Sequence, residues 1–192
     1  FYATGVSLVL HPRNPHVPTT HANFRYIERG DAAWFGGGAD LTPYVLYEED
    51  GTHFHDVLAR TCDTHSPEFY PRFKRWCDEY FHLPHRGEGR GIGGVFFDDV
   101  RPNEDHDMEA LFSWWSDMAR SFLPAYVPIV ERRADLEYDD ALRQWQLQRR
   151  GRYVEFNLLH DRGTLFGLKT GGNVEAILMS LPPQVAWPAP KL

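Results

Sequence analysis

Residues 5–25 read GVSLVLHPRNPHVPTTHANFR and carry the strongest structural signal in the chain. Apolar and β-branched residues alternate with polar ones over Val6–Leu10 and again over Asn23–Glu28, and Gly and Pro bound both runs. This pattern predicts two strands that frame a polar loop. The stretch holds three histidines, two arginines and two asparagines, namely His11, His16, His21, Arg13, Arg25, Asn14 and Asn23. Packing alone does not explain so many proton carriers and anion-binding groups, so the segment predicts a functional site.

The length and composition fit one folded domain. With 192 residues, of which 42% are hydrophobic, the chain can bury a sizeable core. It begins with Phe1 rather than Met, inside a strand-like run, so we expect a single catalytic domain over residues 1–192 that is truncated at the N-terminus. The Pro-rich residues 182–192 predict a C-terminal tail that leaves the fold.

Charge and cysteine content limit the class of protein. A net charge of −7 argues against a general nucleic-acid binder, which needs a cationic surface. The two cysteines, Cys62 and Cys77, form no CxxC pair, which favours a reducing, cytoplasmic setting. No apolar run approaches the roughly 20 residues of a membrane span, so we expect no integral membrane segment.

Further elements follow from periodicity. Apolar residues at helical spacing predict helices over Pro71–His82, Asp105–Phe122 and Asp139–Arg150, and Pro124 and Pro128 should break or kink the second of these. Gly91–Val100 is typical of a buried strand.

The C-terminal third predicts a hairpin. Alternation over Arg152–His160, a turn at residues 161–163 and an extended Thr164–Lys169 indicate two antiparallel strands. Leu41–Glu48 is expected to be extended, and Asn173–Leu181 fits a short helix or a strand. Strands joined by short turns and interspersed with helices predict an α+β fold with a mainly antiparallel sheet.

Several side chains could carry chemistry. His11 and His21 could bind a divalent metal or move protons, although their spacing alone favours hydrogen bonds to the loop backbone. His55 and His85, each near a second histidine, are by spacing alone surface or structural residues.

Two further groups suggest ligand binding. Asn23 and Arg25 lie two apart on a strand, so they face the same way and could clamp a carboxylate; a structural ion pair is the alternative. Asp40 follows three glycines, where it could accept hydrogen bonds from a flat ligand or could simply cap a glycine-rich turn. The chain has no Rossmann fingerprint, so neither flavin nor nicotinamide is indicated.

Long blocks of the chain resemble one family. They are GVSLVLHPRNP (5–15), YPRFKRWCDEYF (70–81), GIGGVFFDD (91–99), YVEFNLLHDRGTLFGLKTGGN (153–173) and LMSLPP (178–183). These blocks are similar to the oxygen-dependent coproporphyrinogen III oxidases, enzymes of haem biosynthesis. The resemblance implies a large antiparallel sheet covered by helices on both faces. It also implies oxidative decarboxylation of the ring A and B propionates of coproporphyrinogen III to vinyl groups, giving protoporphyrinogen IX with molecular oxygen as co-substrate.

The resemblance also implies roles for individual residues. The catalytic positions would be His21, as proton donor, with Asp40, Asp161 and Arg162. The substrate would contact Ser7, Asn23, Phe24, Arg25, Gly171, Gly172 and Asn173. A divalent cation, proposed to be Mn, would bind His11, His21, His55 and His85. Where members usually carry Arg this chain has Asn173, which weakens an expected propionate contact and leaves Arg162 or Lys169 to compensate.

The resemblance further implies a homodimer formed through residues 153–187. Two other functions stay open at this point. One is a non-haem metal-dependent oxygenase or hydrolase that uses the histidines as ligands, and the other is a non-catalytic tetrapyrrole-binding protein.

Overall fold

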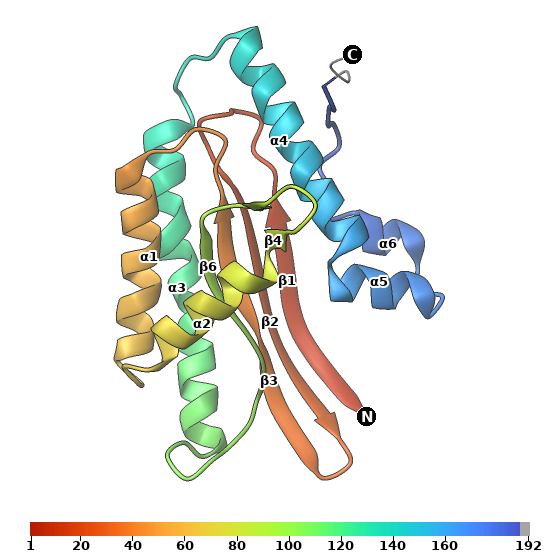
Figure 1. Cartoon of the computed structure of the whole chain (residues 1–192). Helices are drawn as coiled ribbons and strands as arrows, with labels where there is room; N and C mark the ends of the chain where they lie inside the picture. The colour runs from red at the N-terminus through yellow and green to blue at the C-terminus, as the bar shows by residue number, and fades with distance from the viewer. Residues whose placement is uncertain (189–192) are drawn as a thin grey trace.

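A four-stranded antiparallel sheet forms the centre of the computed structural model, which describes residues 1–188 (Figure 1). Its strand order is β1-β2-β3-β6. The strands are β1 (Tyr2–Leu10), β2 (Thr19–Arg29), β3 (Ala32–Thr42) and β6 (Gly93–Val100). The strands expected at Val6–Leu10, Asn23–Glu28 and Gly91–Val100 are thereby confirmed, as is the mixed α+β class.

The register of the sheet brings the polar residues of the opening segment opposite one another. Ser7 of β1 lies opposite Asn23 of β2, and His21 lies opposite Asp40 of β3. Gly30, with φ of 60°, begins the two-residue turn between β2 and β3, as a tight hairpin requires.

The three glycines before Asp40 lie inside strand β3 rather than in a turn. A Cβ atom on Gly37 would come within 2.2 Å of the Asn23 carbonyl oxygen, and one on Gly38 within 2.3 Å of the Val95 carbonyl oxygen. The glycines therefore permit β2, β3 and β6 to approach closely, and no side chain projects from the sheet at these positions.

Six helices and a small hairpin surround the sheet among the described residues. They are α1 (Glu48–Asp63), α2 (Phe69–Tyr80), β4 (His82–Leu83), β5 (Glu88–Gly89), α3 (Met108–Arg133), α4 (Asp140–Leu159), α5 (Arg162–Lys169) and α6 (Val174–Leu178). The helix expected at Pro71–His82 is confirmed as α2, whereas α1 was not predicted. In Figure 1, α1 and α3 lie on one side and α4 to α6 on the other.

Aromatic side chains from two helices and the sheet form the main core. The rings of Phe73 and Trp114 stack at 5.1 Å, and Phe97 of β6 lies 4.6 Å from Trp114. All three side chains are fully buried. This cluster fixes α2 and α3 against β6, and β6 in turn contributes to the site described below.

Of the break or kink predicted at Pro124 and Pro128, the break is wrong, because α3 continues through both prolines to Arg133. A proline inside a helix costs about 3 kcal/mol. Here the following turns bury Tyr126 and Ile129, and the Tyr126 hydroxyl donates to the Pro18 carbonyl oxygen. Tertiary packing therefore outweighs the local penalty.

The C-terminal hairpin is also wrong. Arg152–His160 lies within α4 and its C-cap, and Thr164–Lys169 lies within α5. The buried residues Arg150, Tyr153, Val154 and Asn157 follow helical spacing, and the β-like alternation was coincidental. The ambiguous Asn173–Leu181 contains helix α6.

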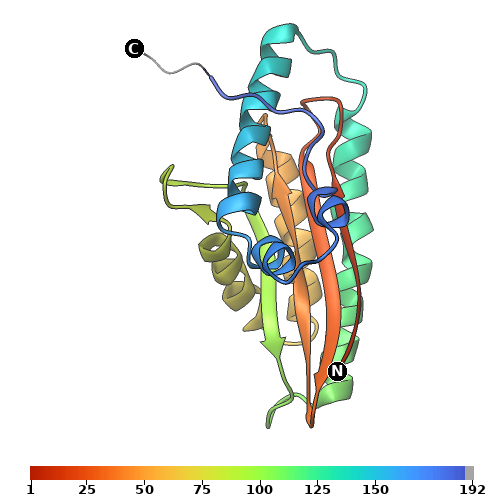
Figure 2. The same ribbon diagram turned by 90° about the vertical axis from the view of Figure 1, so that its right-hand side faces the viewer.

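The described part of the Pro-rich tail lies along α4 instead of leaving the fold (Figure 2). The Ala186 amide donates to the Leu147 carbonyl oxygen at 3.0 Å, and the Trp187 indole donates to Glu155 at 2.9 Å. Gly151 permits this approach, since a Cβ there would lie 2.9 Å from the Ala186 carbonyl oxygen. Residues 189–192 of the predicted tail lie outside the described residues.

None of the described helices combines the length and apolar character needed to cross a bilayer. Cys62 and Cys77 are buried free thiols.

Candidate active site

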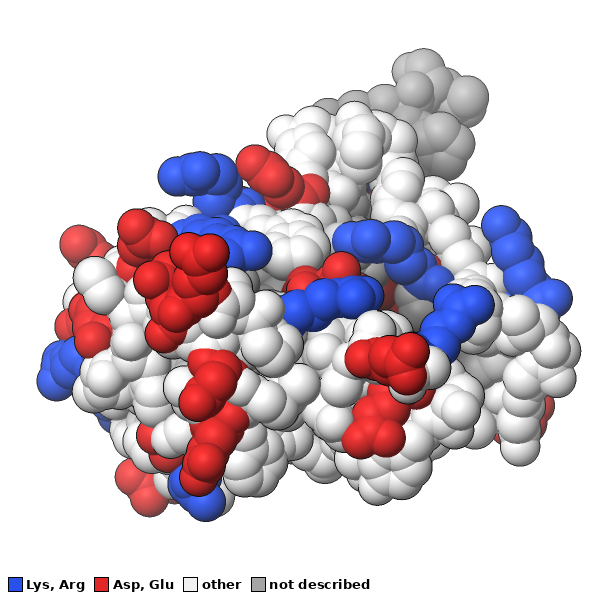
Figure 3. Space-filling model, turned by 90° about the horizontal axis from the view of Figure 1, so that it is seen from below, with Lys and Arg blue, Asp and Glu red and all other residues white. Residues whose placement is uncertain are grey.

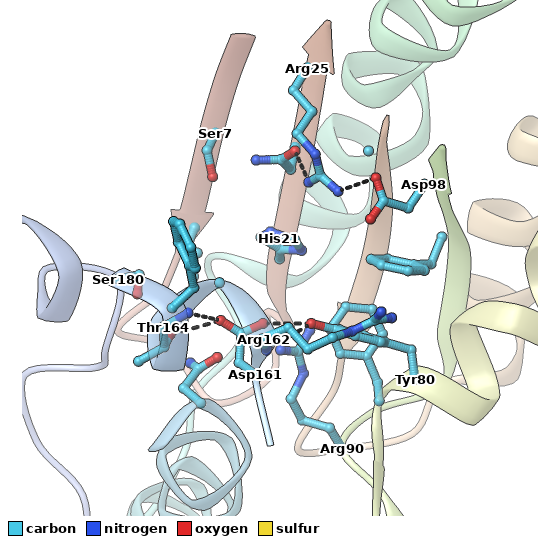
Figure 4. Close-up of a pocket in the computed structure, with 18 of the residues that line it drawn as sticks. Ser7, His21, Arg25, Tyr80, Arg90, Asp98, Asp161, Arg162, Thr164 and Ser180 are labelled. Atoms are coloured by element: carbon cyan, nitrogen blue, oxygen red, sulfur yellow. Dashed lines mark hydrogen bonds and ion pairs between the residues drawn. The ribbon is translucent and has the colours of Figure 1, made fainter. Parts of the chain in front are cut away.

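One cavity of about 530 Å³ lies between the sheet and helices α4 and α5, which is within the usual range for small-molecule sites (Figure 4). Its walls come from β1, β2, β6, α2, α4 and α5, so segments far apart in the sequence meet there. The lining includes the predicted residues Ser7, His21, Asn23, Arg25, Asp161 and Arg162.

Strand β2 divides its side chains between the cavity and the core. His21, Asn23 and Arg25 line the cavity, whereas Phe24 is 3% exposed and packs near the rings of Phe97 and Trp115. Successive side chains of a strand point to opposite faces, so neighbours of a site residue face away from it. The Phe24 side chain therefore faces the core and not the cavity, and a contact between Phe24 and the ligand stays a prediction.

His21, Asp40 and Arg90 form a linked group at the cavity wall. Asp40 accepts a hydrogen bond from His21 Nδ1 at 2.8 Å through one oxygen and from Arg90 Nη2 at 2.5 Å through the other. His21 and Arg90 line the cavity, while Asp40 is buried behind them. Asp40 therefore reaches the cavity only through His21 and Arg90, and its direct contact with a ligand stays a prediction.

The charges of this group are matched. Burial alone raises the pKa of Asp40, but the charge of Arg90 and the hydrogen bond from His21 outweigh it, so that pKa lies below its usual range. A carboxylate can only accept, which places the hydrogen of a neutral His21 on Nδ1. Among the bonds between described residues none involves His21 Nε2, so this nitrogen is available to accept a proton from a ligand.

Arg90 sits in an aromatic cage. Its guanidinium carbon lies 4.0 Å from the Phe81 ring centre, 4.5 Å from Tyr153 and 5.0 Å from Phe156. Its Nε has no hydrogen-bond partner among the described residues. This Nε is itself buried, so the guanidinium acts on the cavity through its positive charge and its bond to Asp40.

Arg25 lies at the other end of the cavity. Its Nη1 donates to the Asn23 side-chain oxygen at 2.9 Å, and its Nη2 pairs with Asp98 at 2.9 Å. Asn23 and Arg25 therefore lie on one face and contact each other, and the alternative ion pair is present as well. That they clamp a carboxylate of a ligand stays a prediction.

Asp161 and Arg162 enter the cavity from the start of α5. Asp161 caps this helix by accepting from the amide and hydroxyl of Thr164, and it accepts a third bond from the Tyr80 hydroxyl. Burial first and Asp161 second raise the pKa of Tyr80 to about 12. Arg162 lies over the Tyr80 ring at 4.9 Å, which leaves its guanidinium beside the cavity.

The structure does not bring the predicted metal ligands together. His11 contacts Thr19 and the Ser180 carbonyl oxygen, His55 contacts Tyr70 and the Ile92 carbonyl oxygen, and His85 contacts His160 and Glu155. Within residues 1–188 no group of three or more His, Cys, Asp or Glu side chains is arranged to hold a metal ion. These four histidines do not fit one common metal centre in this chain.

The segment Gly171, Gly172 and Asn173 also lies apart from the cavity lining. Gly171 has φ of 74° after the end of α5, and Asn173 caps α6 by accepting from the Ala176 amide. Gly171 forms a turn, because glycine adopts positive φ readily, and Asn173 caps a helix through its side-chain oxygen.

The side chains of the site that sequence reasoning missed include Tyr80, Arg90 and Asp98. Tyr80 occupies a helical position that also fits a core residue, and Arg90 sits in a glycine-rich loop without a motif. Asp98 carries a signal that was available: it follows Phe96 by two residues in a strand and so shares its face.

Cationic and acidic side chains also mix on the outer surface, with several Lys and Arg around a hollow in Figure 3.

Comparison with known proteins gives a single answer. Residues 1–190 match the family model described as Coproporphyrinogen III oxidase. The chain is 57% identical to an oxygen-dependent coproporphyrinogen-III oxidase of Drosophila melanogaster, over 97% of this chain and 49% of that protein. It is 55% identical to the chloroplastic enzyme of Glycine max, over 97% of the chain and 50% of that protein. For the enzyme of Francisella tularensis subsp. holarctica the identity is 54%, over 97% and 61%.

The chain thus spans about half to three fifths of the length of these relatives. The match extends over every strand and helix that builds the cavity. From its sequence, the chain belongs to the coproporphyrinogen III oxidase family.

Proposed function

We propose that the protein carries out the oxygen-dependent oxidative decarboxylation of the ring A and B propionates of coproporphyrinogen III, giving protoporphyrinogen IX in haem biosynthesis. One observation carries the proposal: in a member of this family, a single cavity gathers Arg25 and Arg162 with a histidine whose Nδ1 is bonded to a buried carboxylate. Cationic side chains suit the carboxylates of the ligand, and the histidine suits proton transfer.

The reaction balances for each propionate. One –CH₂CH₂COO⁻ group, one O₂ and one proton give one vinyl group, one CO₂ and one H₂O₂. The C–C bond to the carboxylate breaks, the substrate loses two electrons, and dioxygen gains them. The protein has to hold carboxylates, admit oxygen and move protons.

The cavity residues divide these tasks. Arg25, with Asn23 beside it, and Arg162 would each bind a carboxylate by charge-assisted hydrogen bonds. His21 Nε2 would take or return a proton, with Asp40 holding the ring and its tautomer. Arg90 would neutralise Asp40 and so keep that carboxylate as the acceptor of the His21 bond.

The experiment is oxygen consumption measured together with fluorescence detection of the oxidised product. With coproporphyrinogen III we expect both signals, and both should fall at least tenfold in His21→Gln. His53→Gln is the matched control, since His53 is half-buried and bonds the Pro124 carbonyl oxygen away from the cavity. Binding without oxygen consumption would instead identify a tetrapyrrole-binding protein.

The metal-dependent alternative has its own outcome in the same assay. Exhaustive chelation should leave the activity unchanged, because no described group of side chains is built to hold a metal ion. Loss of activity on chelation and its return with Mn²⁺ would favour the metal-dependent reading.

We further propose a homodimer formed through residues 153–187, and helices over both faces of the sheet. Support for the dimer comes from apolar side chains exposed on α5 and beyond α6, with Phe166 at 70% and Met179 at 79% exposure. Light scattering should give twice the chain mass, and Phe166→Ser with Met179→Ser should shift it toward one chain. A cytoplasmic setting is proposed from the two free thiols, whereas the names of two plant relatives place those proteins in the chloroplast.

A further inference from the structure

The geometry points to Asp98 as a resident carboxylate that competes with the ligand's carboxylates for Arg25. This inference deepens the proposed function and rests on it, since it takes a propionate to be the other partner of Arg25. Asp98 thereby sets how tightly the cavity holds its ligand and helps the product to leave.

A bulge in β6 keeps Asp99 off the cavity face that Asp98 shares with Phe96. Between the pairs Phe35–Val100 and Gly37–Phe97, β3 advances two residues while β6 advances three. The bulge contains Asp99, whose φ of 51° makes it the one non-glycine residue with positive φ among those described. Bulges of this kind re-aim side chains beside active sites.

The bulge separates two adjacent carboxylates. Phe97 stays in the core and Asp98 lines the cavity, where its Oδ1 also accepts from the Asp99 amide at 3.0 Å. The Asp99 carboxylate points elsewhere and pairs with Arg101 at 2.6 Å. Val100 then returns to the core. One position therefore serves the cavity and its neighbour does not.

Asp98 and Arg25 approach each other from two strands across β3, as Figure 4 shows. Their contact depends on Gly36, because a Cβ there would lie 2.7 Å from Arg25 Nε and 2.8 Å from Asp98 Oδ1. The two side chains are 31% and 34% exposed. A pair at this exposure is weak and can exchange partners.

The other cavity arginines do not need such an exchange. Arg90 is fixed to Asp40 in a buried pair. Arg162 has no ion pair with any described residue and is free to receive a carboxylate. Arg25 alone must give up an acidic partner of its own before it can fully engage a ligand.

This arrangement has a consequence for turnover. A propionate bound to Arg25 is lost either when its carboxylate leaves as CO₂ or when the product dissociates. Asp98 can then pair with Arg25 again. Replacing Asp98 by Asn should therefore lower KM and kcat together, because substrate and product are both held more tightly. A purely structural role would leave binding unchanged or weaken it.

The test uses two probes, sodium propionate and coproporphyrin III. Asp98→Asn keeps an oxygen that can accept from the Asp99 amide, and Asp98→Ser is a second variant should the first fail to fold. Asp99→Asn is the control, since it removes the same charge one residue away and Asn tolerates positive φ. Propionate binding is followed by the NMR signal of the Arg25 Nε–H group, assigned with Arg25→Lys, and coproporphyrin binding by fluorescence.

We expect both probes to bind roughly threefold to tenfold more tightly to the Asp98 variants, and within twofold of wild type to Asp99→Asn. Equal or weaker binding by folded Asp98 variants would overturn the inference. Failure of the proposed function looks different: coproporphyrin III would not bind the wild type, while the propionate comparison would still decide the role of Asp98.

Discussion

The buried pair of Asp40 and Arg90 should be energetically coupled, and a double-mutant cycle can measure that coupling. The two charged side chains are 4% and 2% exposed, and their atoms approach to 2.5 Å. In Asp40→Asn the Arg90 guanidinium stays buried without a counter-charge, and in Arg90→Met the same is true of the carboxylate. Breaking a buried pair from one side costs about 3–5 kcal/mol of the free energy of unfolding.

The double variant should recover part of this loss. With both charges removed, no uncompensated ion is left in the protein interior, and Met keeps much of the packing against Phe81 and Tyr153. We expect the double variant to be more stable than the sum of the two single losses predicts, by about 2–3 kcal/mol. Urea unfolding of the four proteins, followed by circular dichroism, gives the value.

Activity should behave differently from stability in this cycle. In the double variant the side-chain oxygen of the asparagine at position 40 can still accept from His21 Nδ1–H, but a neutral amide cannot offset the positive charge that His21 gains when it takes a proton. We therefore expect the double variant to regain stability but to stay at least tenfold less active. Single losses that simply add, with a coupling below about 0.5 kcal/mol, would refute the reasoning.

Three further predictions concern the surrounding structure. Gly36→Ala should break the contact between Arg25 and Asp98, because its Cβ would lie within 2.8 Å of both side chains, and an unchanged NMR signal of the Arg25 Nε–H group would contradict this. Asp161→Ala should lower the free energy of unfolding by about 1–2 kcal/mol through loss of the α5 cap, and a urea midpoint equal to wild type would count against the role as cap. Burial raises the pKa of Tyr80 and of Tyr153 to about 12, so above about pH 10 these tyrosines ionise in the unfolded chain but stay neutral in the folded protein. The free energy of unfolding should therefore fall between about pH 10 and 12, and a constant value over that range would contradict the prediction.

Local pattern was sufficient for the strands that carry the site. The predicted strand placed Asn23 and Arg25 on one face, because a strand has a fixed period of two. His21, which was expected in the loop, lies on the same face because β2 already begins at Thr19. The same rule, applied to every residue, would have assigned Phe24 to the core and drawn attention to Asp98.

Longer-range features could not be predicted in this way. The helix α3 passes through two prolines because burial in the core outweighs a local cost, and local periodicity does not include that burial. Arg90 reaches Asp40 across 50 residues, and its place becomes evident only once β3 and the aromatic cage are assembled. In the C-terminal part of α4, apolar and polar residues alternate by chance, and this alternation was mistaken for a strand.

Coproporphyrin III binding by the Arg25→Gln/Arg162→Gln double variant tests the central claim most directly. If the cavity recognises a polycarboxylate through these two guanidinium groups, the affinity measured by fluorescence should fall at least about tenfold relative to wild type at the same ionic strength. An affinity equal to wild type, in a variant with an unchanged circular dichroism spectrum, would contradict it.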